Sequence, residues 1–348
     1  MTTLTLTRPD DWHLHLRDGA QMAAVLPDTA RRFARAIVMP NLKPPVTTVT
    51  EADAYRQRIL AALPAGLEFT PLMTLYLTER TPADEIDRAR ESGFVHAVKL
   101  YPAGATTHSD AGVTDLRRCW SVLERMQTLG LPLLVHGEVT DPAVDVFDRE
   151  AVFIERVLAP LLHDFPALRV VLEHVTTREG VDFVRAAGEN VAATITPQHL
   201  LFDRNALFVG GLRPHHYCLP VLKRATHRQA LIEAAISGSA KFFLGTDSAP
   251  HARGAKESSC GCAGCYSACA ALELYAQAFE DAGALPRLEG FASHYGADFY
   301  RLPRNTARIT LERTPYAVPK ELTFGDGQTL VPLLAGETLR WRLREASV

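Results

Sequence analysis

Several kinds of sequence feature are missing from this chain, and each absence argues against a particular class of protein. The sequence opens with no basic leader and apolar segment, and no run approaches the ~18 apolar residues that a membrane span needs. Basic residues form no runs and the formal net charge is only −3, so there is no electrostatic footprint for nucleic acid or an anionic membrane. We therefore expect a cytosolic protein that acts on a small molecule and binds neither nucleic acid nor membrane.

Nucleotide-binding fingerprints are also lacking, because neither GxGxxG after a strand nor GxxxxGK[ST] occurs. Without a secretory signal, the six cysteines are expected to be reduced thiols rather than disulfides. Cys260, Cys262, Cys265 and Cys269 leave a structural zinc knot open as an alternative, although the usual paired CxxC spacing is missing.

What the chain does contain is an alternation of short apolar runs with amphipathic helical stretches, the pattern of a parallel sheet covered by helices. The sequence predicts eight strands, at residues 12–16, 36–39, 69–77, 97–101, 133–136, 170–175, 191–196 and 242–247. Eight repeats favour a closed (β/α)8 TIM barrel, with an open doubly wound sheet as the alternative. No linker, repeat or composition break divides the chain, so we expect one domain over 1–348, with a C-terminal tail from about 301 packed on the barrel.

The first predicted strand carries His13-Leu14-His15. Because side chains alternate with period two, both imidazoles point to one side and the leucines to the other, so the two rings can meet one ion. Arg17 shares this parity and suits an anion clamp beside the histidines. The alternative interpretation is a pair of partly buried histidines that are hydrogen-bonded in a core.

Further metal-compatible groups follow later strands, where barrel enzymes assemble their active sites. They are Lys99, His136, His174 and Asp247. Imidazoles and carboxylates suit zinc. A lysine in an apolar strand has a lowered pKa, and its neutral amine can capture carbon dioxide to form a carbamate that bridges two ions. Lys99 reaching solvent or a substrate anion, and Asp247 capping a helix, remain the alternatives.

These residues stand in motifs that closely resemble the shorter, single-function bacterial dihydroorotases of the amidohydrolase superfamily. The resemblance covers nearly the whole chain. It is carried by DWHLHLRD (11–18), VMPNL (38–42), KLYP (99–102), VHGE (135–138), EH (173–174), TITPQH (194–199), GTDSAPH (245–251), SCGCAGC (259–265) and LAGET (334–338).

The resemblance implies two Zn²⁺ ions per chain, bridged by N6-carboxylated Lys99 and a water or hydroxide. His13, His15 and Asp247 would hold the more buried ion, and His136 and His174 the other. It also implies a substrate site made of His15, Arg17, Asn41, His136, Leu219, His251 and Ala263. For Asn41, which follows Met39-Pro40, a turn role is the alternative interpretation.

The implied activity is the reversible cyclisation of N-carbamoyl-L-aspartate to L-dihydroorotate and water in pyrimidine biosynthesis, with Asp247 as the proton carrier. Residues 102–112 would form a lid whose Thr106 and Thr107 touch substrate, or else a passive surface loop. The resemblance also suggests a homodimer. Another cyclic-amide hydrolase, such as a hydantoinase or allantoinase, and a catalytically silent barrel subunit are the alternative functions.

Overall fold

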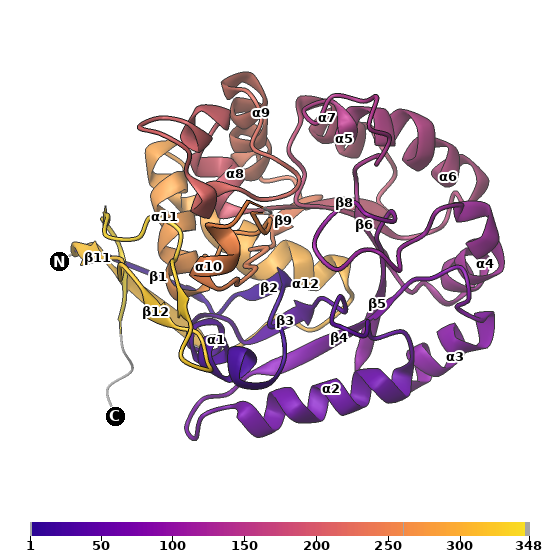
Figure 1. Ribbon diagram of the computed structural model, residues 1–348, viewed down its shortest axis with the longest axis horizontal. Coiled ribbons are helices and arrows are strands. Elements are labelled where there is room, and N and C mark those ends of the chain that lie inside the picture. Colours follow the sequence, from indigo (N-terminus) through magenta and orange to yellow (C-terminus); the bar gives the residue numbers. More distant parts are fainter. Residues whose placement is uncertain (1, 260, 345–348) are drawn as a thin grey trace.

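A ring of parallel strands surrounded by helices makes up most of the chain (Figure 1), which is described at residues 2–259 and 261–344 in a computed structural model. The eight-stranded sheet runs in the order β2 to β9, and each neighbouring pair is parallel. Its strands are β2 (Asp10–Leu14), β3 (Arg35–Val38), β4 (Thr70–Tyr76), β5 (Val95–Leu100), β6 (Leu133–His136), β7 (Val170–Glu173), β8 (Val191–Ile195) and β9 (Phe242–Leu244).

The ring closes between its first and last strands. Leu14 and Ser248 form a parallel bridge, and the backbone N–H of His15 donates to the carbonyl of Ser248 at 3.1 Å. All eight strands lie where the sequence predicts them, to within two residues at their starts and three at their ends. The predicted (β/α)8 barrel is therefore confirmed, and the open sheet is excluded.

The described residues form a series of α-helices, most of which cover the outside of the ring and connect its strands (Figure 1). They are α1 (Gly19–Arg32), α2 (Val49–Ala62), α3 (Ala83–Ser92), α4 (Trp120–Leu129), α5 (Arg149–Phe153), α6 (Ala159–Asp164), α7 (Arg178–Ala186), α8 (Pro197–Leu201), α9 (Ala225–Ile236), α10 (Arg253–Lys256), α11 (Ala271–Asp281) and α12 (Tyr295–Phe299). π-Helical turns, Ile154–Leu158 and Gly290–His294, join α5 to α6 and precede α12. Short 3₁₀ helices lie at Leu116–Cys119, Arg204–Leu207, Pro214–His216, Ala268–Ala270 and Leu285–Arg287.

Local sequence signals explain several helix ends. Thr48 and Glu51 form a reciprocal capping box at the start of α2, which satisfies backbone N–H groups that have no intrahelical acceptor. Gly93 and Gly130 end α3 and α4 at positive φ angles of 71° and 66°, a conformation that glycine adopts without steric cost. No helix in the described ranges is long and apolar enough to cross a membrane.

The inside of the ring is packed at two levels. At the lower level an apolar cluster contains Trp12, Ile37, Leu72, Ala97, Leu134, Val171, Ala192 and Phe243. Tyr300, just after α12, stacks on Trp12 with ring centroids 4.5 Å apart and closes this end. Because alternate residues share a face, the residues two positions further along four of these strands also point inward. They are Lys99, His136, Glu173 and Thr194, and they form the floor of the site.

The two ends of the chain build a smaller sheet beside the barrel. β1 (Thr3–Thr7) pairs antiparallel with β10 (Arg308–Glu312), and β10 pairs with β15 (Arg342–Leu343). Two further ribbons pair β11 (Tyr316–Ala317) with β14 (Thr338–Leu339) and β12 (Leu322–Thr323) with β13 (Thr329–Leu330). The sequence predicted a tail from about residue 301 but none of these strands. Buried Trp341, Phe324 and Leu311 belong to the same apolar cluster as the barrel helices.

Candidate active site

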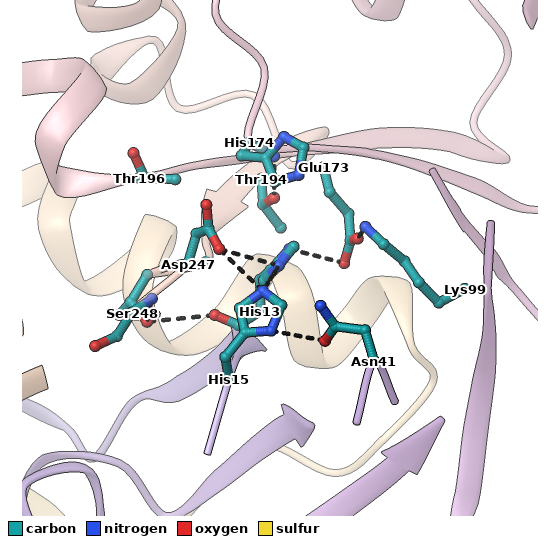
Figure 2. Close-up of polar contacts among 12 residues, drawn as sticks. His13, His15, Asn41, Lys99, Glu173, His174, Thr194, Thr196, Asp247 and Ser248 are labelled. Carbon is teal, nitrogen blue, oxygen red and sulfur yellow. Dashed lines mark hydrogen bonds and ion pairs between the residues drawn. The ribbon is translucent and has the colours of Figure 1, made fainter. Parts of the chain in front are cut away.

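Two histidines and one aspartate converge where the ring closes (Figure 2). His13 Nε2 lies 3.2 Å from His15 Nε2, so both rings point the same way, as the alternation predicted. Asp247 Oδ1 lies 3.4 Å from His13 Nε2 and 3.2 Å from His15 Nε2. All three side chains are buried, and their ligand atoms lie within 4.8 Å of one another. This is a ready set of ligands for one cation.

Backbone pairing across the ring closure fixes this arrangement. The N–H of Asp247 donates to the carbonyl of His13 at 2.9 Å. Asp11, buried beneath, accepts from the N–H of Thr246 at 2.8 Å and of His13 at 3.1 Å. Asp247 has a φ of 45°, a left-handed conformation that is uncommon for residues other than glycine.

Lys99 lies on the floor of the site, and its side chain is fully buried. Its ammonium contacts the carboxylate of Glu173, whose other oxygen lies 3.1 Å from His13 Nδ1 (Figure 2). Burial lowers the pKa of Lys99, and Glu173 opposes this shift. The direction agrees with the one expected from an apolar strand.

Glu173 is a functional candidate to which the sequence interpretation gave no role. It ends β7 two residues after Val171, which belongs to the apolar cluster inside the barrel. Alternation therefore predicts an inward carboxylate, and that signal was present in the sequence. Glu173, His13 and His174 form a second group whose ligand atoms lie within 4.8 Å of one another.

His136 and His174 lie side by side in the same site, and His174 lies next to His13. Their ring centroids are 4.8 Å apart, and the rings of His13 and His174 are 5.0 Å apart. His136 Nε2 lies 2.8 Å from a carboxylate oxygen of Glu138. His174 follows β7 with a φ of 42°, and its N–H donates to the hydroxyl of Thr194 at 2.8 Å. The structure thus brings all of the predicted metal ligands to one end of the barrel.

The protonation states of these groups fit a cation site. Burial lowers the pKa of His15 to about 4 and that of His174 well below its usual value, so both imidazoles are neutral and offer lone pairs. Burial opposes ionisation of Asp247, but His13 and His15 outweigh it and lower the aspartate pKa to about 2. His174 Nδ1 is buried and makes no hydrogen bond within the described ranges. Neutral imidazoles with an anionic carboxylate are the donor set that zinc prefers.

An anion site adjoins the ligand cluster. Arg17 is 8% exposed, has a φ of 65°, and its carbonyl accepts from the Tyr55 hydroxyl at 2.6 Å. Its Nε donates to the carbonyl of Pro250 at 3.0 Å, and its Nη2 lies 2.9 Å from His251 Nε2. No carboxylate in residues 2–259 or 261–344 forms an ion pair with this guanidinium. A buried, unpaired arginine needs an anionic partner, because an uncompensated buried charge is costly.

Asn41 links the histidines to the predicted lid. Its Oδ1 lies 2.9 Å from His15 Nδ1, and its Nδ2 donates to the carbonyl of Thr107 at 3.0 Å. The Asn41 oxygen therefore accepts the Nδ1 proton of His15, which leaves the Nε2 lone pair facing Asp247. Such a contact fixes the tautomer that a metal ligand needs.

The connection that follows β5 lies over the pocket. The Thr107 hydroxyl donates to the carbonyl of Ala263 at 3.3 Å, and the Ser109 hydroxyl donates to that of Thr106 at 2.6 Å. The pocket is lined by residues from six barrel segments and three loops, namely His13, His15, Arg17, Asn41, Tyr101, Thr106, Thr107, His136, His174, Leu219, Asp247, Ala249, Ala263 and Gly264. Every predicted ligand and substrate-contact residue except Lys99 and His251 is among them. Lys99 lies beneath the pocket, and His251 contacts Arg17 at its edge.

The cysteines do not form a metal cluster among the residues that the structure describes. Cys119, Cys218, Cys262, Cys265 and Cys269 are free thiols, and the metal-ligating groups found there contain only histidine and carboxylate side chains. Cys260, which the alternative zinc knot includes, lies outside the described residues.

Comparisons with known proteins agree on one family. Residues 8–318 match the model of the amidohydrolase family. The chain is 70% identical to a dihydroorotase of Cupriavidus necator over 341 residues, covering 98% of this chain and 99% of that protein. Its fold matches a Campylobacter jejuni dihydroorotase crystal structure with a TM-score of 0.90 and 36% identity, over 99% of this chain and 98% of that one. A Saccharomyces cerevisiae dihydroorotase in complex with 5-fluoroorotic acid matches with a TM-score of 0.91 and 33% identity, over 99% of both chains.

Proposed function

Since this chain belongs to the amidohydrolase family, and within it to the shorter single-function bacterial dihydroorotases, we propose how its own residues perform the reaction of that group. The reaction is the reversible cyclisation of N-carbamoyl-L-aspartate to L-dihydroorotate and water, the third step of de novo pyrimidine synthesis. The enzyme is therefore a hydrolase of cyclic amide C–N bonds.

Members of the family are metal-dependent, and the described part of the chain holds two candidate groups of metal ligands that share His13. Our assignment is two Zn²⁺ ions per chain, one held by His13, His15 and Asp247 and the other by His136 and His174. Lys99, carboxylated on its Nζ, would bridge them together with a water or hydroxide. When bound, such ions polarise a carbonyl oxygen and lower the pKa of water. The buried, neutral imidazoles of His15 and His174 support this assignment. The burial of Lys99 supports it too, because burial favours the neutral amine over the ammonium.

The observation that carries the substrate assignment is the buried Arg17 guanidinium without a carboxylate partner in the described ranges, beside the ligand cluster. Both dihydroorotate and carbamoyl aspartate carry a free α-carboxylate. The planar guanidinium offers that group parallel hydrogen bonds, and Asn41 and His251 complete the anion site. Leu219 and Ala263 contribute backbone contacts, and His15 and His136 border the reacting end. A hydantoin without this carboxylate would leave the site unpaired, which discriminates against it.

Asp247 carries the proton in our mechanism. During hydrolysis it takes a proton from the attacking water and delivers it to the amide nitrogen that leaves the ring. During synthesis it takes a proton from the attacking carbamoyl nitrogen and delivers it to the carboxylate oxygen that leaves as water. Its position 3.2 Å from His15 and its lowered pKa keep it anionic before the proton arrives. Thr106 and Thr107 belong to a lid that excludes water during the reaction.

The remaining assignments concern the protein in the cell. We place it in the cytoplasm as a homodimer of single-domain subunits, each a barrel with its C-terminal tail from about residue 301 packed against it. Its partner is the small-molecule substrate, and neither nucleic acid nor membrane has a part in the reaction.

The direct test follows both reaction directions with purified, zinc-loaded protein. We expect carbamoyl aspartate cyclisation and dihydroorotate hydrolysis, with dihydrouracil and allantoin turned over far more slowly. Preferential turnover of dihydrouracil or allantoin would instead indicate a hydantoinase or an allantoinase. No turnover of any of these compounds at full metal loading would indicate a silent barrel.

A further inference from the structure

Lys256, the last residue of α10, is a buried ammonium outside the group of residues assigned above. Its side chain is 3% exposed, and no carboxylate in the described part of the chain forms an ion pair with it. Its Nζ instead donates to the carbonyls of Tyr217, Cys262 and Gly264 at 2.7, 2.8 and 2.7 Å. An ammonium has three protons, so its whole hydrogen-bonding capacity is used by the backbone.

The three carbonyls belong to two segments that lie far apart in the sequence and meet beside Lys256. Tyr217 stands two residues before Leu219, and Cys262 and Gly264 flank Ala263 on both sides. Leu219 and Ala263 both line the pocket. The N–H of Gly264 donates to the carbonyl of Tyr217 at 3.0 Å, so the two segments are also joined directly beside the ammonium.

The direction of the carbonyls matters for the pocket. Those of residues 262 and 264 turn towards Lys256, whereas the carbonyl of Ala263 lies 3.0 Å from His251 Nε2 and 3.3 Å from the Thr107 hydroxyl. Lys256 therefore holds one side of the 262–264 segment, and the other side of that segment contacts His251 of the anion site and Thr107 of the lid. A buried charge has to be paired or fully hydrogen-bonded, so these carbonyls cannot turn away without a large free-energy cost.

We propose that Lys256 is a positioning residue, whose ammonium clamps the Tyr217–Leu219 and Cys262–Gly264 backbones so that Leu219 and Ala263 are preorganised for the substrate. This inference depends on the proposed function, because the substrate contacts of Leu219 and Ala263 are part of it. Preorganisation lowers the cost of ordering the loops on binding, so its loss weakens substrate affinity rather than chemistry.

Lys256→Met, which keeps the length of the side chain but has no donor, tests the proposal. We expect the KM for dihydroorotate to rise by about 10-fold or more while kcat changes by less than about 3-fold and zinc content stays at the wild-type level. Affinity for orotate, used as an unreactive probe in calorimetry, should fall by the same factor as KM rises. Lys256→Arg keeps the charge but presents a planar fork to three converging carbonyls, so it should rescue only part of the affinity.

Lys241→Met is the matched control. Its Nζ also donates to backbone carbonyls, those of Val184 and Ala187, but it lies just before β9, at the opposite end of the strand from Asp247. A KM and an orotate affinity for Lys256→Met within about 2-fold of wild type, or a shift equalled by Lys241→Met, would overturn the proposal. If Lys256→Met does not fold, Lys256→Gln, which retains two donors, carries the same comparison.

Measurements on the wild-type protein separate the proposed function from the role of Lys256. A wild-type protein that neither hydrolyses dihydroorotate nor binds orotate would overturn the proposed function, and this inference with it. If the wild-type protein does both and Lys256→Met has the same KM and orotate affinity, only the role of Lys256 would be overturned.

Discussion

Arg17 has an environment that is costly to build and therefore informative about the ligand. The guanidinium is buried, its carbonyl is held by Tyr55, and its charge has no carboxylate partner within the described ranges. We expect Arg17→Met to lose a charge-assisted contact of about 1.5–3 kcal/mol, which corresponds to a KM higher by about 10–150-fold in both reaction directions. Steady-state kinetics with zinc analysis of the same samples would measure this.

Arg58→Met is the matched control for that substitution. Arg58 forms a surface ion pair at 2.8 Å with Asp18, the residue that follows Arg17, but it does not line the pocket of the ligand cluster. Exposed ion pairs of this kind contribute little to stability. The control should keep the wild-type KM. An unchanged KM in Arg17→Met as well would remove Arg17 from the substrate site.

Asp247 combines two roles that a conservative substitution can separate. Asparagine keeps the shape and one coordinating oxygen but cannot carry a proton. Asp247→Asn should therefore retain most of its metal while kcat falls by about 10²–10⁴-fold, with little change in substrate affinity. Because one proton carrier serves a reversible reaction, hydrolysis and cyclisation should slow by the same factor under matched conditions.

Asp247→Ala provides the comparison, since it removes the ligand as well as the proton carrier. This variant should also bind the ion shared with His13 and His15 more weakly. Near-normal turnover of Asp247→Asn at full metal loading would disprove the proton-carrier role, and Glu138, 2.8 Å from His136, would become the next candidate.

The connection between β5 and α4 gives a prediction about closure. Two contacts hold this connection over the pocket: the Thr107 hydroxyl donates to the Ala263 carbonyl, and the Asn41 amide donates to the Thr107 carbonyl. Replacing Thr106 and Thr107 together with glycine should lower kcat/KM without loss of metal, because the lid would no longer stay closed over the substrate. Wild-type kinetics for the double variant would make this segment a passive surface loop.

The barrel strands show how far the sequence could predict structure. Their apolar runs and regular spacing were sufficient for the ring and for the side on which His13 and His15 lie. Strict alternation would also place Trp12 on the same side as Leu14, yet Trp12 packs inside the barrel. The reason is a register shift between Asp11 and Leu14, which reverses the faces within β2. Single-residue irregularities of this kind depend on the neighbouring strand and leave no periodic signal.

Strand ends were predicted less well, for a related reason. The sequence extended the last barrel strand to Asp247 and the sixth to Val175, whereas β9 ends at Leu244 and β7 at Glu173. His174 and Asp247 leave the sheet with φ values of 42° and 45°. Tertiary contacts enforce these conformations, so local propensity gives no warning of them. The short C-terminal strands were missed because each has only two to five residues, and β10, β11, β14 and β15 also pair with segments distant in the sequence.

For the protein as a whole, the site depends on closure of the ring. His13 and His15 come from the first barrel strand and Asp247 from the end of the last, so this ligand set exists only when the ring has closed. The residue types could be recognised in the sequence because they recur at the ends of successive strands. Glu173, which contacts both Lys99 and His13, could be placed inside the barrel but its partners could not, since they depend on how three strands are staggered.

A zinc titration can show whether the site holds two metal ions bridged through Lys99. Metal-free protein would be titrated with Zn²⁺ under carbon dioxide while dihydroorotate hydrolysis and bound zinc are followed in the same samples. We predict that activity rises until two ions are bound per chain, and that Lys99→Ala binds fewer ions and loses most activity, with partial recovery when short-chain carboxylates are added. Full activity at one ion per chain, or wild-type rate and zinc content in Lys99→Ala, would exclude a pair of ions bridged through Lys99.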